Sequence, residues 1–213
     1  MNQSEGGARG RFITFEGVEG SGKSTRCAGL TAVMRKMGMD VVHTREPGGP
    51  PTAERIRGIL LDPELDVTPL TELMLYLASR ASNVDLVVRP ALTAGTHVIC
   101  ERYSDATLAY QVGGRGLPLD KVRESDSLAT GGLLPDLTIL LDLDPEVGFA
   151  RLRSQGRSRD RIELEELDFH RRVRKMYLEL ATGDPRFLVL DGTMDPQELD
   201  AIILKTVTTL TDR

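Results

Sequence analysis

Short apolar runs alternate with longer amphipathic stretches along this 213-residue chain. The apolar runs are rich in valine, isoleucine and leucine, and each is followed by glycine or charged residues, as is typical of buried strands. They predict strands within residues 11–17, 39–45, 96–101, 136–144 and 186–192.

Between these runs, apolar residues recur at the spacing of one helix face. The first helix is predicted to begin near Lys23 and to end near Lys36, with Gly38 just past its end. A long periodic stretch predicts helix over 68–92. Further helices are predicted over 104–114, 119–130, 145–155, 163–183 and 195–210.

The alternation of strands and helices predicts an α/β fold with a parallel sheet covered by helices on both faces. No linker divides the chain, so we expect one domain over 11–213, preceded by a flexible polar tail, MNQSEGGARG, over 1–10. In such sheets, ligands bind beyond the carboxyl ends of the strands. The chemistry is therefore expected where the strands end.

GVEGSGKST, residues 17–25, follows the first strand and fits the pattern G-x-x-x-x-G-K-[ST] of a phosphate-binding loop. Backbone N–H groups of such a loop bind phosphate oxygens, and the positive end of the next helix assists them. Lys23 is expected to reach the β and γ phosphates of ATP, and the Ser24 hydroxyl to bind Mg²⁺. The predicted ATP-binding residues are Gly17, Val18, Glu19, Gly20, Ser21, Gly22, Lys23, Ser24 and Thr25.

A second basic segment, GRSRDRIE, is too charged and glycine-broken to be a core element. Arg157, Arg159 and Arg161 occur at alternate positions, and Arg151 and Arg153 precede them. Such a run is often a solvated face. Five arginines within eleven residues of an acidic protein instead predict a mobile lid over about 151–163. Its arginines would neutralise the migrating phosphoryl group.

Three further arginines, Arg45, Arg80 and Arg102, are isolated in the sequence. Their elements are expected to place all three near the carboxyl edge of the sheet. Because guanidinium groups suit phosphate, they could hold a second phosphorylated ligand against ATP.

Composition narrows the class of protein. A net charge of −5 argues against an extended nucleic-acid footprint. No apolar run approaches the roughly 20 residues that span a membrane, and the amino terminus lacks a signal peptide core. Two cysteines, Cys27 and Cys100, make no disulfide framework, which favours a reducing, cytoplasmic setting.

Taken together, the chain resembles thymidylate kinase over nearly its whole length, from about Arg11 to Leu210. The blocks that carry the resemblance occur in the family's order and spacing: FEGVEGSGKST, TREPGG, LYLASR, ERY, AYQVGGRGLPLDKV, LLPDLTILLDLDPEVG and DRIE. The likeness is to bacterial members that carry basic residues in the lid. It implies a P-loop kinase fold with a five-stranded parallel sheet, a homodimer, Mg²⁺ as cofactor, and ATP and dTMP as substrates.

The resemblance also implies residue roles. Arg45, Arg80 and Arg102 would contact or position the dTMP phosphate, and Arg80 would also lie near the base edge. Tyr76 would stack on thymine, and Thr107 would hydrogen-bond it. Catalysis would fall to Lys23, Arg102 and the lid arginines Arg157, Arg159 and Arg161.

Tyr110 would pack against the deoxyribose, and Glu19 would reach the sugar 3′-hydroxyl. Tyr76 and Arg80 are four residues apart and share one helix face, which agrees with a common site, although core packing is a rival interpretation for both tyrosines. Glu101 stands where the family usually has aspartate before the arginine. It would serve the metal together with Ser24.

Two alternatives remain. A deoxynucleoside kinase acting on thymidine would carry an E-R-S signature, and this chain has Glu101-Arg102-Tyr103-Ser104 and Glu46-Pro47. A nucleoside hydroxyl requires a carboxylate base, whereas a nucleotide phosphate is already ionised at neutral pH. The arginines therefore favour the nucleotide. A non-catalytic ATP-binding protein could dispense with these arginines and the lid.

Overall fold

The computed structural model describes residues 9–154 and 160–211. Its strands are β1 (Phe12–Glu16), β2 (Val41–Arg45), β3 (His97–Glu101), β4 (Leu137–Asp142) and β5 (Phe187–Asp191). The α-helices are α1 (Lys23–Lys36), α2 (Pro51–Leu61), α3 (Pro69–Asn83), α4 (Arg89–Thr93), α5 (Ser104–Thr107), α6 (Leu119–Thr130), α7 (Pro145–Ser154), α8 (Leu167–Ala181) and α9 (Pro196–Thr211). Two π-helical segments complete the elements, η1 (Val84–Val88) and η2 (Leu108–Gly114).

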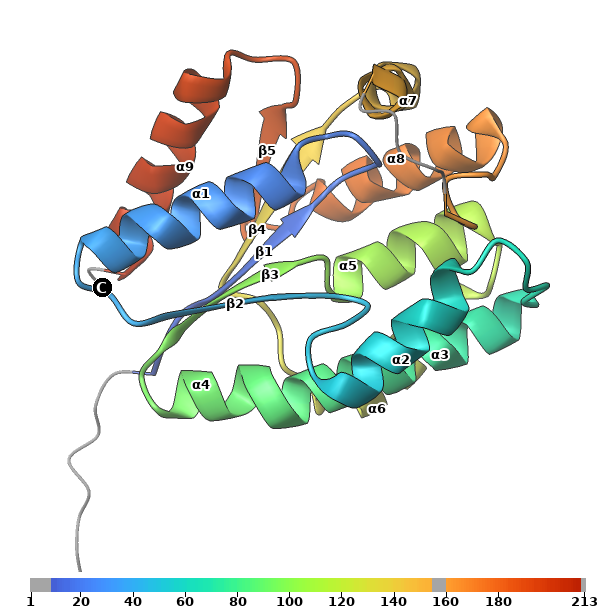
Figure 1. The fold of residues 1–213 in the computed structure, drawn as a ribbon, viewed down its shortest axis with the longest axis horizontal. Coiled ribbons are helices and arrows are strands. Elements are labelled where there is room, and N and C mark those ends of the chain that lie inside the picture. The colour runs from blue at the N-terminus through green and yellow to red at the C-terminus, as the bar shows by residue number, and fades with distance from the viewer. Residues whose placement is uncertain (1–8, 155–159, 212–213) are drawn as a thin grey trace, which may run out of the picture.

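The strands form one parallel sheet in the order β2-β3-β1-β4-β5, and helices cover both faces (Figure 1). Both the α/β class and the five-stranded parallel sheet expected from the sequence are thereby confirmed. Because the strands are parallel, their carboxyl ends meet at one edge of the sheet. The phosphate loop leaves β1 there, between its neighbours β3 and β4.

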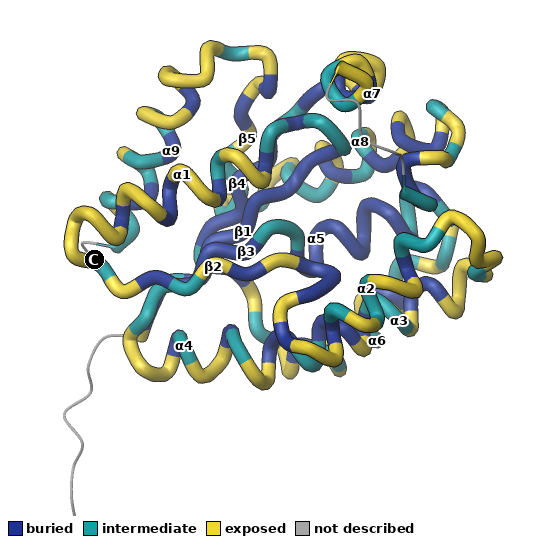
Figure 2. The backbone as a smooth tube through the Cα atoms, in the orientation of Figure 1, coloured by how far each residue is buried: buried dark blue, intermediate teal, exposed yellow. Residues whose placement is uncertain are grey.

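Successive side chains of β1 point to opposite faces of the sheet, so β1 contributes to the core on both faces. Ile13 and Phe15 pack with side chains of α1 and α9, including Met34 and Ile203. Phe12 points to the opposite face and packs with η1 and α4 residues. Figure 2 shows the central strands buried and the outer helix surfaces exposed. A strand covered on both faces explains the nearly continuous apolar run.

Helix boundaries depart from the sequence expectation at three places. Helix α2 lies at 51–61, where the sequence analysis assigned no element. The helix expected over 68–92 is interrupted by η1. Helix α8 begins at Leu167, because residues 161–164 form a turn, in which the Asp160 carboxylate accepts the N–H groups of Ile162 and Glu163, and Glu166 is extended. Across the described residues, no helix is long and apolar enough to cross a bilayer.

Candidate active site

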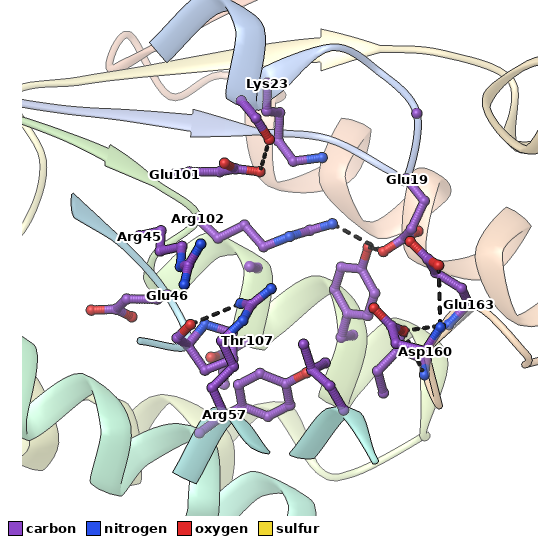
Figure 3. Close-up of a pocket in the computed structure, with 18 of the residues that line it drawn as sticks. Glu19, Lys23, Arg45, Glu46, Arg57, Glu101, Arg102, Thr107, Asp160 and Glu163 are labelled. Atoms are coloured by element: carbon purple, nitrogen blue, oxygen red, sulfur yellow. Dashed lines mark hydrogen bonds and ion pairs between the residues drawn. The ribbon is translucent and has the colours of Figure 1, made fainter. Parts of the chain in front are cut away.

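A cavity of about 500 Å³ opens at the carboxyl edge of the sheet, and Figure 3 shows most of the residues that line it. The phosphate loop and the ends of β2 and β3 bound it on one side, and α3, η2 and the segment 160–163 on the other. The cavity brings together most residues expected to bind ATP, dTMP or metal: Glu19, Gly20, Gly22, Lys23, Ser24, Thr25, Arg45, Tyr76, Arg80, Glu101, Arg102, Thr107 and Tyr110.

The phosphate loop has the tight backbone that its glycines predict. Gly22 precedes α1 in the left-handed region, with φ of 93°. Gly20 passes so close to α7 that a Cβ there would lie 2.2 Å from the carbonyl oxygen of Gly148. Gly17, Val18 and Ser21 belong to the loop but are buried behind the cavity wall.

Lys23 lies across the loop. Its Nζ donates hydrogen bonds to the carbonyl oxygens of Gly17 and Val18 at 2.9 and 2.8 Å. Burial, and after it the positive charge of Arg102, lowers the pKa of Lys23 to about 8. A negative ligand beside this ammonium would raise the pKa again, so the site favours an anion.

Ser24 and Glu101 meet at the base of the loop, where the serine hydroxyl donates to the glutamate Oε1 at 2.9 Å. Hydroxyl and carboxylate oxygens are ligands that suit Mg²⁺. Among the described residues, no group of three or more His, Cys, Asp or Glu side chains gathers to hold a metal ion. Mg²⁺ typically takes one or two protein oxygens plus phosphate and water, so Ser24 and Glu101 could supply the protein oxygens.

Arg102 is held from several sides. Its Nη2 donates to Glu19 at 2.9 Å, its Nη1 donates to the Tyr177 hydroxyl at 3.2 Å, and its guanidinium lies 4.9 Å from the Tyr110 ring centroid. Its backbone has φ of 67°, an uncommon conformation for a residue with a side chain. Such outliers gather at functional sites, where the surrounding structure fixes them.

Glu19, a variable position of the phosphate loop, is an ionised acceptor. Besides Arg102, the Tyr110 hydroxyl donates to it, and His170 Nδ1 lies 3.2 Å from its other oxygen. Burial opposes ionisation, but hydrogen bonding from His170 and the charge of Arg102 outweigh it and hold the pKa of Glu19 well below its usual range. The sequence analysis missed His170, which lies on α8 far along the chain.

Arg80 is 1 % exposed and bridges three partners. It donates to Glu46 at 2.7 Å and to the Thr107 hydroxyl at 2.7 Å, and it forms an ion pair with Asp126. This guanidinium therefore neutralises two buried carboxylates and orients Thr107. Arg45, by contrast, is half exposed and pairs with Glu54 of α2 at 3.0 Å. Arg57 of α2, another cavity residue missed in the sequence, donates to the Pro47 carbonyl.

The expected lid is described in part, since Arg157 and Arg159 lie outside the described residues. Arg151 lines the cavity and bonds the carbonyl oxygens of Gly20 and Gly192. Arg161 does not line the cavity. It donates to the Leu60 carbonyl at the end of α2, and its Nη2 lies 2.6 Å from a Glu72 oxygen. Its expected catalytic role stays a prediction.

Tyr76 and Gln111 face the cavity from α3 and η2. The Gln111 side chain is buried and donates to Glu72 at 2.7 Å, while its amide oxygen has no hydrogen-bond partner within 9–154 and 160–211. An unpaired buried acceptor is costly unless a ligand satisfies it. The sequence analysis also missed this residue, because nothing local distinguishes a glutamine in AYQVGG.

Glu16, at the end of β1, supports the site from below. It accepts hydrogen bonds from the Tyr103 backbone at 2.7 Å and the Tyr177 hydroxyl at 2.8 Å. Burial, and after it the charge of Asp105, raises the pKa of Glu16 to about 8. The folded protein therefore keeps a proton that the unfolded chain loses near pH 4.5.

This shift predicts a pH-dependent stability. Between pH 4.5 and about 8 the folded state binds one proton more than the unfolded state at Glu16, so its contribution falls as pH rises. Relative to Glu16→Gln, wild type should lose up to about 1.4 kcal/mol of unfolding free energy per pH unit in this window. Urea denaturation of both proteins across pH 5 to 8 measures the difference; parallel pH profiles would contradict the assignment.

The parallel sheet, the phosphate loop at its carboxyl edge and the cavity with guanidiniums beside the loop define a nucleotide kinase of the P-loop class. Residues 15–203 match the family model described as thymidylate kinase. The chain belongs to the thymidylate kinase family.

Curated relatives named thymidylate kinase match over nearly their whole length. The Deinococcus radiodurans protein is 51 % identical over 197 residues, covering 92 % of this chain and 95 % of the relative. The Thermomicrobium roseum protein is 50 % identical over 203 residues, covering 95 % and 96 %. The Pelobacter propionicus protein is 48 % identical over 205 residues, covering 93 % and 94 %.

Proposed function

We propose that this chain transfers the γ-phosphate of ATP to dTMP, giving ADP and dTDP for dTTP synthesis. One observation carries the proposal: a single cavity joins the phosphate loop to two guanidiniums, Arg45 and Arg102, and to the ring of Tyr76. A loop alone would serve any nucleotide-binding protein. The arginines beside it supply a place for a second phosphate, and membership of the family agrees with that pairing.

On the donor side, the loop N–H groups and Lys23 bind the ATP phosphates. Ser24 and Glu101 would hold Mg²⁺, which would supply positive charge to neutralise the donor phosphates. Glu101, which is longer than the aspartate usual at this position, reaches the Ser24 hydroxyl directly. The Ser24 hydroxyl oxygen and a Glu101 carboxylate oxygen can therefore bind the same ion. Arg151 lies beside the loop, and Arg157, Arg159 and Arg161 remain the proposed lid cations.

On the acceptor side, Arg102 holds the dTMP phosphate in line with the γ-phosphate, assisted by Arg45. Because that phosphate is already ionised, positioning and charge neutralisation suffice, and no general base is required. Glu19 and Tyr110 form one hydrogen-bonded unit beside Arg102. The unit would contact the sugar, with Glu19 at the 3′-hydroxyl and the ring of Tyr110 where a 2′-hydroxyl would lie.

At the base end, Tyr76 stacks on thymine, and two polar groups read its edge. Thr107 accepts a hydrogen bond from Arg80, which leaves its own hydroxyl hydrogen to donate to a base carbonyl. The Gln111 oxygen, which is buried and has no hydrogen-bond partner among the described residues, would accept from the ring N–H. A donor beside an acceptor matches the C=O and N–H of thymine.

The rival thymidine kinase activity needs a carboxylate free to accept a proton. Glu46 is poorly suited, because Arg80 and Asn83 donate to its two oxygens at 2.7 and 3.0 Å. Glu101 is engaged by Ser24. The engagement of these two carboxylates, Glu46 and Glu101, supports the nucleotide as acceptor.

Chromatographic detection of dTDP from ATP, dTMP and Mg²⁺ tests this function. We expect dTDP to form in step with ADP, and excess EDTA to abolish both products until Mg²⁺ is restored, because protein groups alone leave the donor charge unneutralised. ADP formation without dTDP would overturn the proposal, and turnover unaffected by EDTA would overturn the metal assignment.

We further propose a cytoplasmic homodimer. Exposed apolar side chains on the adjoining helices α3 and α6 support a second copy as partner: Leu70, Met74 and Leu128 are 58 %, 50 % and 86 % exposed. Sedimentation of the full chain at micromolar concentration measures its mass, and a single species of monomer mass would count against the dimer.

A further inference from the structure

A buried carboxylate, that of Glu72, is hydrogen-bonded to Gln111 of the cavity lining. Glu72 lies on α3, is fully buried and does not line the cavity. The Gln111 amide nitrogen donates to its Oε1 at 2.7 Å. Arg115 donates to both oxygens, at 3.1 and 2.9 Å, and Arg161 lies 2.6 Å from Oε2.

Glu72 is held in its ionised form. Burial opposes the charge, but hydrogen bonds from Arg115 and Gln111 outweigh it and keep the pKa of Glu72 below its ordinary value. An ionised carboxylate accepts hydrogen bonds and donates none. Gln111 must therefore present its NH₂ group to Glu72, which leaves its buried oxygen without a hydrogen-bond partner among the described residues, on a side chain that lines the cavity.

We propose that Glu72 is a specificity-determining positioning residue that fixes Gln111 as a hydrogen-bond acceptor, so that the cavity selects pyrimidines carrying a ring N–H. Thymine and uracil have this N–H beside a carbonyl group. Cytosine has a bare ring nitrogen beside an amino group, so it opposes both Gln111 and Thr107. A site built to hydrogen-bond its substrate rejects analogues that leave its polar groups unpaired. This inference rests on the proposed phosphorylation of dTMP.

The experiment is the ratio of kcat/KM for dTMP to that for dCMP in Glu72→Gln. A carboxamide at position 72 can present either its oxygen or its NH₂ group to Gln111. The Gln111 amide is then free to rotate so that its NH₂ group, rather than its oxygen, faces the base. We expect the ratio of kcat/KM for dTMP to that for dCMP to fall roughly tenfold or more. KM should rise for dTMP, fall for dCMP and stay unchanged for ATP.

Glu165→Gln is the matched control. Glu165 also pairs with Arg115, at 2.6 Å, but no hydrogen bond joins it to Gln111 in the described structure. The same chemical change there should leave the selectivity ratio as in wild type. Glu72→Asp is the second variant, for use if Glu72→Gln does not fold. The shorter aspartate keeps the charge that Arg115 and Arg161 require but withdraws from Gln111, so it should also lower the selectivity ratio.

A double-mutant cycle with Gln111→Ala distinguishes a Glu72 that positions Gln111 from a Glu72 that only stabilises the fold. If Glu72 acts through Gln111, then Glu72→Gln should not change the ratio further in the Gln111→Ala background. Equal losses for dTMP and dCMP would assign Glu72 a structural role and overturn the inference. Wild type that fails to phosphorylate dTMP would instead overturn the proposed function, so the two failures are distinct.

Discussion

Replacing Arg102 with alanine is expected to lower kcat/KM for dTMP about a hundredfold to a thousandfold, the effect of removing one preorganised donor from developing charge. Arg102 is held in place by Glu19 and Tyr177 before any substrate arrives. Its loss would leave acceptor phosphate charge without a partner in a site of low dielectric. Steady-state assays with varied dTMP and saturating ATP measure the change.

Two variants sharpen that result. Arg102→Lys retains a charge without the planar fork, so it should recover part of the loss. Arg55→Ala serves as the control, because Arg55 is exposed on α2 and does not line the cavity. Wild-type turnover by Arg102→Ala would show that the acceptor phosphate binds elsewhere.

Replacing Arg80 with methionine is expected to lower the unfolding free energy by about 3 to 5 kcal/mol, the usual effect of leaving a buried charge unpaired. Glu46 and Asp126 would both lose their guanidinium partner. Burial already raises the pKa of Glu46, so protonation should relieve part of the loss as pH falls toward 5. Urea denaturation at pH 5 and pH 8 measures both effects.

Arg171→Met is the matched control for Arg80. Arg171 also pairs with two carboxylates, those of Glu146 and Asp168, but on the exposed surface of α8. Solvent can replace those pairs, so little change in the denaturation midpoint is expected. Equal effects at positions 80 and 171 would show that burial of the Arg80 network does not govern its strength.

Local signals predicted much of the fold. Helix α1 runs from Lys23 to Lys36 as expected, because the glycines of the phosphate loop and Gly38 bracket an uninterrupted helix. Helix α2 was missed although Pro51 at its first turn and the buried Ala53 and Leu60 give it a helical pattern. The preceding Pro and Gly residues resembled a turn, and tertiary packing on α3 completes this short helix.

The sequence could direct attention to Lys23, Ser24 and Arg102, which line the cavity, because one motif or one family block carries each of them. It could not indicate partners that are remote in sequence. Asp126 follows Arg80 by 46 residues, and His170 follows Glu19 by 151, yet each pair is in contact. Nothing near Glu72 indicates that it orients Gln111. Only the packed fold brings these side chains together.

The most direct test of the central claim is ADP release with ATP and Mg²⁺ when dTMP or thymidine is the acceptor. The account predicts turnover with dTMP and little with thymidine, since Arg102 and Arg45 serve a phosphate and Glu46 and Glu101 are engaged by hydrogen bonds. Turnover with thymidine in preference to dTMP would contradict it and make one of those two carboxylates a catalytic base.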